Sequence, residues 1–366
     1  MFLLEKNFNI ELITLPSVEG YAPSNTSIVN YNDELVFQTR YVSYSKHFTS
    51  NRFNPFDLPL NQNYIFNGTC YESRNFRYNG DKFEEVDYYK KVWHYCMFKG
   101  LEDARFVVWD GGLYVYGTRC DLIKDCSCIV IYTPEGEEII ARSPYSHTIE
   151  KNWMAIPDKP FTFVYGFIDG DTIVVKVERD GDCRVAYSID NKNNRDLLHG
   201  VRGGTPLMKV SDGYIAVVHK QICDNNSYSY RHAFVHFDEE LRVKKVSKWF
   251  IFINDVCEFC TGLTMKGDKV YITFSILDCV PYLMTVGLED LMYYIYNRTT
   301  KYNEYVFDNK YYIDLIDILQ KHRQYKSVGI IANYVLTHNY ISALLPLYLE
   351  EMDLKMFLKI KYLKHD

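Results

Sequence analysis

The sequence predicts an all-β fold, a five-bladed β-propeller with a helical C-terminal extension. The first observation is a unit that recurs five times, in which two runs of alternating apolar and polar residues flank a tight polar turn. The second is the spacing of these units, because four of the turns follow one another at intervals of roughly 50 to 55 residues, as in propeller blades. The third is that further strand-like runs lie between the units. The four turns are centred on Asp110, Lys159, Asp212 and Asp268.

The recurring units are β-hairpins with polar or charged residues near their open ends. They span residues 24–41, 102–119, 150–167, 202–220 and 258–278. Their turns contain Asn-Asp, Asp-Gly-Gly, Pro-Asp-Lys-Pro, Ser-Asp-Gly and Lys-Gly-Asp, all typical of chain reversal. The interval between the first two turns is longer, and we interpret residues 50–63 as an inserted loop.

A second hairpin completes each blade. Runs that alternate around polar turns occupy residues 128–141, 172–189 and 232–246. Two hairpins make a four-stranded sheet, and five such sheets around an axis make the propeller. If the first hairpin of each blade is the inner one, its open ends face one mouth of the central channel. We therefore expect polar groups from all five blades to converge there.

The C-terminal part follows a different pattern. Residues 311–325 and 339–365 have apolar residues at helical spacing. We divide the chain into a propeller catalytic domain, residues 1–296, and a helical extension, residues 297–366, with residues 297–310 as the linker. The extension is expected either to pack on the propeller or to dock a protein partner.

Composition excludes several classes of protein. Of 366 residues, 47% are hydrophobic and 24% are charged, which is typical of a soluble globular protein, and the net charge of -6 favours no nucleic-acid partner. No apolar stretch is long enough for a membrane span, and the N-terminus does not resemble a signal peptide. We therefore expect a cytoplasmic protein with reduced cysteines. Cys257 and Cys260 have zinc-knuckle spacing but lack a second pair, so neither a metal nor another cofactor is expected.

Three motifs carry a family resemblance. The sequence Glu102-Asp103-Ala104-Arg105 opens the second hairpin, and Asp121 follows its end. The run "DGYIAVVH" ends on His219, and "EFCTGL" is followed by "SILD", which ends on Asp278. With these motifs, most of residues 20–285 resembles the five-bladed propellers of glycoside hydrolase family 130. That family includes inverting β-mannoside phosphorylases, related hydrolases and mannosyl-transferring proteins.

The resemblance implies an enzyme that catalyses inverting glycosyl transfer. The transferred unit would be mannose-like, the donor a sugar phosphate or sugar nucleotide, and the acceptor an oligosaccharide or glycan. It also implies that Asp121 donates a proton to the glycosidic oxygen and that Tyr230 lies beside the phosphate. The third hairpin ends "VYGF" where the phosphorylases place an arginine, so we expect Arg202 and Lys151 to supply the positive charge.

Side-chain chemistry extends the candidate site, because carboxylates and amides bind sugar hydroxyls and cationic groups bind phosphate oxygens. The residues expected to bind substrate are Glu102, Asp103, Arg105, Arg40, Asn152, Asp278 and Glu258. Those expected to bind phosphate are Lys151, Arg202, His219 and Tyr230.

Two other functions remain open from the sequence. A glycoside hydrolase would use water in place of phosphate and needs a carboxylate base, for which Glu150 and Glu258 are candidates. A non-catalytic carbohydrate-binding propeller needs neither acid nor base. Arg105 also has a second interpretation, as a structural bracket, meaning a buried arginine paired with carboxylates that fixes the start of the second blade.

Overall fold

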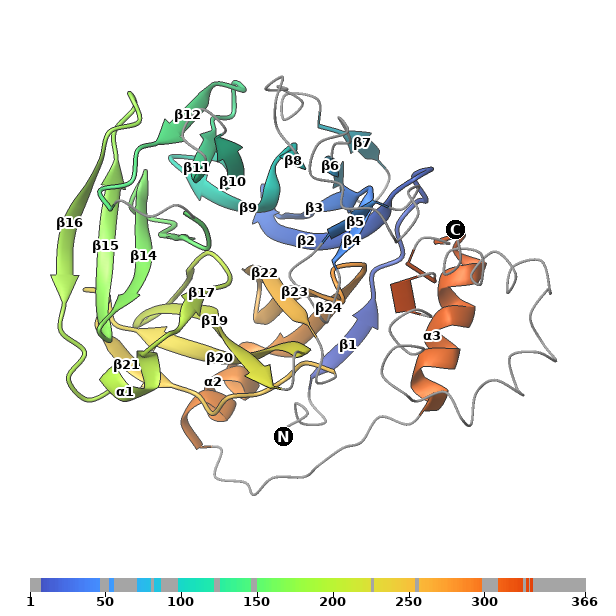
Figure 1. The fold of residues 1–366 in the computed structure, drawn as a ribbon. Coiled ribbons are helices and arrows are strands. Elements are labelled where there is room, and N and C mark those ends of the chain that lie inside the picture. The colour runs from blue at the N-terminus through green and yellow to red at the C-terminus, as the bar shows by residue number, and fades with distance from the viewer. Residues whose placement is uncertain are drawn as a thin grey trace.

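The structure is a computed structural model of the chain. It describes residues 8–46, 53–55, 71–79, 82–86, 98–121, 126–145, 150–224, 227–253, 257–297, 309–324, 327–328 and 330–331. Five sheets stand as blades around a central axis, all antiparallel except for the short parallel pair β6–β8, which confirms the predicted five-bladed propeller (Figure 1).

Blade 1 forms where the first hairpin is predicted. From the axis outward its strands are β2 (Ala22–Tyr31), β3 (Glu34–Val42), β6 (Tyr71–Tyr78) and β7 (Phe83–Glu85), and β8 (Phe98–Lys99) pairs with β6. Asn32 and Asp33 at the turn have φ of 52° and 61°, a left-handed conformation that Asn and Asp tolerate in two-residue hairpin turns. Of the predicted inserted loop only β5 (Phe53–Pro55), paired with β4 (Tyr44–Lys46), lies within the described residues.

Blades 2 and 3 are packed together through aromatic side chains. Blade 2 contains β9 (Glu102–Trp109), β10 (Gly112–Asp121), β11 (Cys126–Tyr132) and β12 (Glu138–Ala141). Blade 3 contains β13 (Met154–Ala155), β14 (Thr162–Ile168), β15 (Asp171–Val177) and β16 (Cys183–Ile189). Trp109 packs edge-on against Phe163 with ring centroids 5.5 Å apart, and its Nε1 donates to the carbonyl of Ile156 at 2.7 Å. These contacts fix the inner strands of the two blades relative to each other.

Blade 4 has a divided inner strand. It contains β17 (Arg202–Gly203), β18 (Met208–Val210), β19 (Gly213–Asp224), β20 (Ser227–Phe237) and β21 (Val243–Val246), and α1 (Arg195–Leu198) precedes it. A Cβ on Gly203 would lie 2.2 Å from the carbonyl oxygen of Asn152, and one on Gly204 would lie 2.7 Å from that of Val217. Gly203 therefore permits the close approach of blade 4 to the start of blade 3, and Gly204 permits close packing against β19 within blade 4.

Blade 5 closes the ring with a strand from the other end of the chain. Its strands from the axis outward are β22 (Glu258–Lys266), β23 (Lys269–Ile276), β24 (Val280–Gly287) and β1 (Asn9–Leu12). In the register, Asn9 lies opposite Thr285 and Leu12 opposite Tyr282. The sequence analysis did not assign β1. This pairing joins the first and last parts of the propeller and leaves no blade incomplete.

Helices follow blade 5 and pack on it. They are α2 (Leu288–Asn297) and α3 (Asn309–Lys321), and the latter confirms most of the helix predicted at 311–325. Tyr294 of α2 and Leu319 of α3 are buried in one apolar cluster with strands of blade 5. The predicted helix at 339–365 lies outside the described residues, and the division at residue 297 stays a prediction. None of the described helices has the length and apolar character needed to cross a membrane.

Candidate active site

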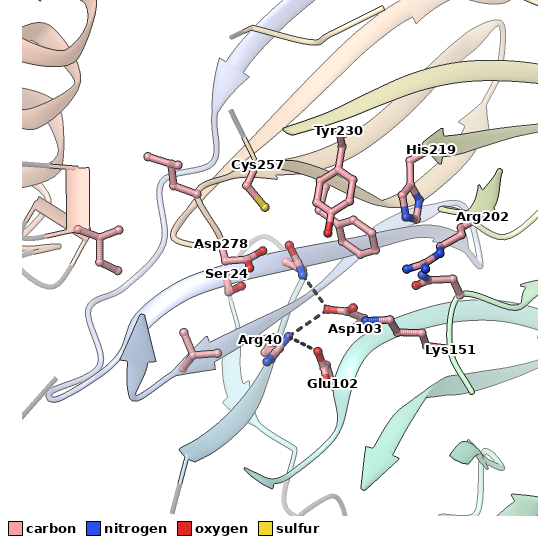
Figure 2. A pocket seen from close by; sticks show the side chains of 16 residues that line it. Ser24, Arg40, Glu102, Asp103, Lys151, Arg202, His219, Tyr230, Cys257 and Asp278 are labelled. Atoms are coloured by element: carbon pink, nitrogen blue, oxygen red, sulfur yellow. Dashed lines mark hydrogen bonds and ion pairs between the residues drawn. The ribbon is translucent and has the colours of Figure 1, made fainter. Parts of the chain in front are cut away.

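A polar pocket lies at one mouth of the propeller, and all five blades contribute to it (Figure 2). Most of its lining residues stand at the open ends of the first hairpins, as the repeat predicts. The lining residues are Ser24, Asn25, Arg40, Val42, Glu102, Asp103, Lys151, Asn152, Arg202, His219, Tyr230, Cys257, Phe259, Leu277, Asp278 and Ile330.

The structure brings most of the predicted site residues together in this pocket. The predicted residues that line it are Arg40, Glu102, Asp103, Lys151, Asn152, Arg202, His219, Tyr230 and Asp278. Arg105 and Glu258 are not among the lining residues. The backbone of Asp121 ends β10 opposite Cys126, but its side chain lies outside what the structure describes, so its role as the acid stays a prediction.

Asp103 is the centre of a buried network that joins blades 1 and 2. Its Oδ1 accepts from Arg40 Nη1 at 3.0 Å and from Asn25 Nδ2 at 2.7 Å. Arg40 also donates from Nε to Ser73 Oγ at 2.9 Å and lies 3.8 Å from Glu102. Burial acts to raise the pKa of the Asp103 carboxyl, but the nearby guanidinium charges and the amide hydrogen bond outweigh it and lower the pKa. Asp103 is therefore ionised and fixed in position.

Arg105 binds three blades together below the pocket and is only 1% exposed. Its Nη1 donates to the carbonyl of Asp103 at 2.7 Å, its Nε to the carbonyl of Gly204 at 2.6 Å, and its Nη2 to Asn152 Oδ1 at 3.2 Å. Asp103 and Asn152 both have left-handed φ, 51° and 65°. These hydrogen bonds hold two strained residues at the starts of blades 2 and 3, which favours the bracket reading of Arg105.

The side of the pocket formed by blades 3 and 4 carries positive charge that forms no ion pair with a carboxylate of the described residues. Lys151 and Arg202 are both exposed, and no carboxylate in the described part of the chain forms an ion pair with either. Figure 2 shows them on the same side of the pocket as His219. Such a pair of exposed cations can bind an oxyanion without first breaking an ion pair.

His219 is a neutral, buried group next to these cations. Burial, and then the neighbouring His232 and Arg202, hold the pKa of His219 well below its usual value. Its ring packs edge-on against Tyr230, with centroids 5.2 Å apart, and against Phe259 at 5.1 Å. Nδ1 of His219 has no hydrogen-bond partner among the described residues. A neutral imidazole in this setting can donate or accept a hydrogen bond with a ligand, but it contributes no charge.

The opposite side of the pocket carries Asp278. It lies on the turn between β23 and β24, where Leu277 and Asp278 both have φ of 52°. The amide of Leu277 donates to the carbonyl of Cys257 at 2.8 Å, which holds the turn against the start of blade 5. Figure 2 shows Asp278 across the pocket from Arg202, so the two ends of the pocket differ in charge.

Neither candidate hydrolytic base lines the pocket. Both oxygens of Glu258 accept from backbone amides, those of Ile253 and Phe252, each at 2.7 Å. Glu150 accepts from Trp153 Nε1 at 3.1 Å and from the Tyr165 hydroxyl at 3.2 Å. Glu258 and Glu150 thus stabilise local structure in blades 5 and 3 respectively.

Several pocket residues were missed by the sequence analysis. Asn25 carries no functional prediction in the sequence analysis, and Cys257 is considered there only as half of a cysteine pair. Ser24 and Phe259 lie at hairpin ends, so the repeat itself held the signal for them. Ile330 comes from the C-terminal extension, and no sequence pattern linked it to the mouth of the propeller. In the described residues, no group of three His, Cys, Asp or Glu side chains is placed to hold a metal ion.

The likeness of this chain to known proteins is found in structure. No family model matches the chain, and no curated protein matches it. Among solved structures, a β-1,2-mannobiose phosphorylase from Listeria innocua, in complex with β-1,2-mannobiose, is 12% identical, with 81% of this chain and 95% of that chain covered and a TM-score of 0.48. A mannose phosphorylase from Leishmania mexicana, in complex with phosphate ion, is 15% identical, with 75% and 87% covered and a TM-score of 0.44.

A third structure comes from work on the GH130 family of mannoside phosphorylases and on its hydrolases, which target β-1,2 mannosidic linkages in Candida mannan. It is 13% identical, with 74% of this chain and 85% of that chain covered and a TM-score of 0.44. The chain is similar to GH130 structures. The solved structures similar to this chain thus include members of glycoside hydrolase family 130, the family that the sequence resembles. At these identities and TM-scores, the chemistry of this chain has to be argued from its own side chains.

Proposed function

We propose that this protein is an inverting glycoside phosphorylase that exchanges a mannose-like unit between phosphate and a sugar acceptor. The observation that carries the proposal is the charge separation within one pocket. Lys151 and Arg202 occupy one side without carboxylate partners in the described chain, and Asp278 lies across from them. The mannose-like identity of the transferred unit comes from the sequence resemblance.

The cationic side suits a phosphate group. Lysine supplies a mobile ammonium and arginine a planar fork, and both bind phosphate oxygens well. Neutral His219 and the Tyr230 hydroxyl add groups that hydrogen-bond without further charge. Burial raises the pKa of Tyr230, so its hydroxyl stays protonated and can donate to an oxyanion.

The carboxylate side suits a sugar. Glu102 is 43% exposed at its side chain, and Asp278 is half-buried, so both can accept hydrogen bonds from hydroxyls. Asp103 and Arg40 lie on the same side as Glu102, in a network that is already formed before any ligand binds. A fixed network of this kind orients a substrate without a large loss of entropy on binding.

The reaction balances with the groups proposed. A phosphate oxygen attacks the anomeric carbon, the glycosidic carbon–oxygen bond breaks, and the leaving oxygen takes a proton. The products are a sugar 1-phosphate of inverted configuration and an acceptor with a free hydroxyl. Asp121 is the proposed proton donor, a role that rests on the family resemblance. Hydrolysis would need a base to activate water, and both candidates for it are held outside the pocket.

The test is turnover by the purified full chain. A panel of β-mannosides is incubated with and without inorganic phosphate, and mannose 1-phosphate and free mannose are measured. We expect phosphate-dependent mannose 1-phosphate, and the reverse reaction from mannose 1-phosphate and a sugar acceptor. Arg202→Ala should lower kcat/KM for phosphate by about tenfold or more, since it removes a charged hydrogen-bonding group. Arg184→Ala, which changes an exposed arginine on β16, is the matched control.

Three outcomes would contradict the proposal. Release of free mannose that is independent of phosphate would indicate a hydrolase. Release of nucleotide from a nucleotide sugar, with none of the phosphate-dependent reaction, would indicate a transferase of another kind. Saccharide binding without any turnover would indicate a binding propeller.

A further inference from the structure

The C-terminal extension reaches the pocket. Ile330, which lies beyond α3, is one of the lining residues and is 6% exposed. We propose that Ile330 forms the end wall of the acceptor side of the pocket and limits the length of the saccharide that fits. This inference rests on the proposed function, because it assigns a specificity role within the same site.

The segment that carries Ile330 is fixed to the propeller by specific contacts. Gln324 Nε2 donates to the carbonyl of Leu15 at 2.8 Å, and Ser327 Oγ donates to the carbonyl of Cys279 at 2.8 Å. Both side chains are buried. Cys279 directly follows Asp278, so Ser327 is bonded to the same turn that presents a carboxylate to the pocket. The described residues around Gln324 and Ser327 therefore have a defined position relative to the site.

Ile330 belongs to an aliphatic part of an otherwise polar lining. Val42, Leu277 and Ile330 are the aliphatic lining residues, and each is at most 6% exposed. They offer no hydrogen bond to a sugar hydroxyl, so an additional sugar unit at this place would lose its hydration without compensation. Leu277 neighbours Asp278 in the chain, and Ser327 of the segment that carries Ile330 is bonded to Cys279, which puts Leu277 and Ile330 on the Asp278 side.

The direction of the reaction identifies which sugar meets the wall. In an inverting displacement the attacking and leaving oxygens lie on opposite sides of the anomeric carbon. If phosphate lies beside Lys151 and Arg202, the leaving sugar lies toward the side that carries Asp278 (Figure 2). The leaving sugar is the acceptor of the reverse reaction. Ile330 thus bounds the acceptor and favours a short one.

The test compares two isoleucines of the same segment. Ile331 is fully buried in the same apolar cluster and does not line the pocket, so Ile331→Ala removes the same atoms without changing the wall. Both alanine variants should melt at a lower temperature than the wild type. Only Ile330→Ala should raise the ratio of kcat/KM for a trisaccharide to that for a disaccharide, by about tenfold, the effect of a few methylenes in a binding pocket.

A milder variant, Ile330→Val, guards against loss of folding and should shift the ratio in the same direction by less. Equal ratios in Ile330→Ala and Ile331→Ala would overturn the inference. If the wild type turns over no substrate, the proposed function fails, and calorimetric binding of mannose and manno-oligosaccharides to the same proteins decides the inference. In that titration, tighter binding of longer saccharides by Ile330→Ala, but not by Ile331→Ala, supports the role of Ile330 as the end wall. The same length preference in both variants, or no binding by the wild type, overturns the inference.

Discussion

The two sides of the pocket differ in how their charges are compensated. On the side of blades 1 and 2, Arg40 and Asp103 are buried and neutralise each other through a 3.0 Å contact. On the side of blades 3 and 4, Lys151 and Arg202 are exposed and make no ion pair with a described carboxylate. The first arrangement stabilises the fold and fixes groups in place. The second leaves charge available to a ligand, so stability and binding are separated within one site.

The largest effect on stability should come from Arg105, which lies beneath both sides. Arg105→Met removes hydrogen bonds to three blades and leaves buried carbonyl groups without their donor. We expect the free energy of unfolding to fall by about 3–5 kcal/mol in chemical denaturation, because each buried acceptor left without a donor costs about 1–3 kcal/mol. Arg184→Met, on the exposed edge strand β16, should change it by less than about 0.5 kcal/mol. Equal effects of the two substitutions would contradict the bracket role.

A substitution on the side of blades 1 and 2 should have the next largest effect on stability, and this effect should depend on pH. Asp103→Asn removes the closer of the two carboxylates that contact the buried Arg40 and leaves Glu102 at 3.8 Å, and we expect a loss of about 2–3 kcal/mol at pH 7. Because the folded-state pKa of Asp103 is lowered, its contribution is fully present above the unfolded-state value of about 3.9 and is lost as pH falls through the folded value. The difference between wild type and Asp103→Asn should therefore shrink below about pH 4. A difference that is constant with pH would show that Asp103 is not ionised.

The junction of blades 3 and 4 provides an intermediate case. The added Cβ of Gly203→Ala would lie 2.2 Å from the backbone oxygen of Asn152, so one strand has to move. We expect a loss of about 1–3 kcal/mol, typical of overpacking, together with weaker phosphate binding because Lys151 adjoins the displaced residue. Thermal melts with and without phosphate measure both effects. Unchanged stability of Gly203→Ala would mean that the fold does not depend on the close approach of Gly203 to Asn152.

Substitutions on the side of blades 3 and 4 should have the smallest effect on stability. Lys151→Ala and Arg202→Ala remove exposed groups, so each should change the free energy of unfolding by less than about 0.5 kcal/mol. Chemical denaturation in the absence of phosphate measures this. A loss comparable to that of Asp103→Asn would remove the distinction between the two sides.

The sequence was sufficient for the local parts of the fold. Alternation and turn residues predicted each inner hairpin, because both are read within about 20 residues. The strand β1 was missed because its partner Thr285 lies at the other end of the chain and four residues of alternation are too weak a signal alone. The repeat also predicted that Asp103, Arg202 and His219 belong to the site, because each lies near the open end of an inner hairpin.

Other parts of the site depend on tertiary structure. Ile330 reaches the pocket only through the packing of the extension on blade 5, which no local pattern encodes. Glu258 begins a conspicuous motif, but its backbone partners come from a segment whose path the sequence does not specify. Residue type alone therefore could not separate a structural carboxylate from one that binds substrate.

The most direct test of the charge-separated pocket is calorimetric titration of inorganic phosphate into three proteins. They are the wild type, the double variant Lys151→Ala/Arg202→Ala, and the control Arg184→Ala. We predict saturable binding to the wild type and the control, and an affinity weaker by about a hundredfold or more in the double variant, from two lost charged contacts. Equal affinity in all three proteins, or no binding to the wild type, would contradict the account.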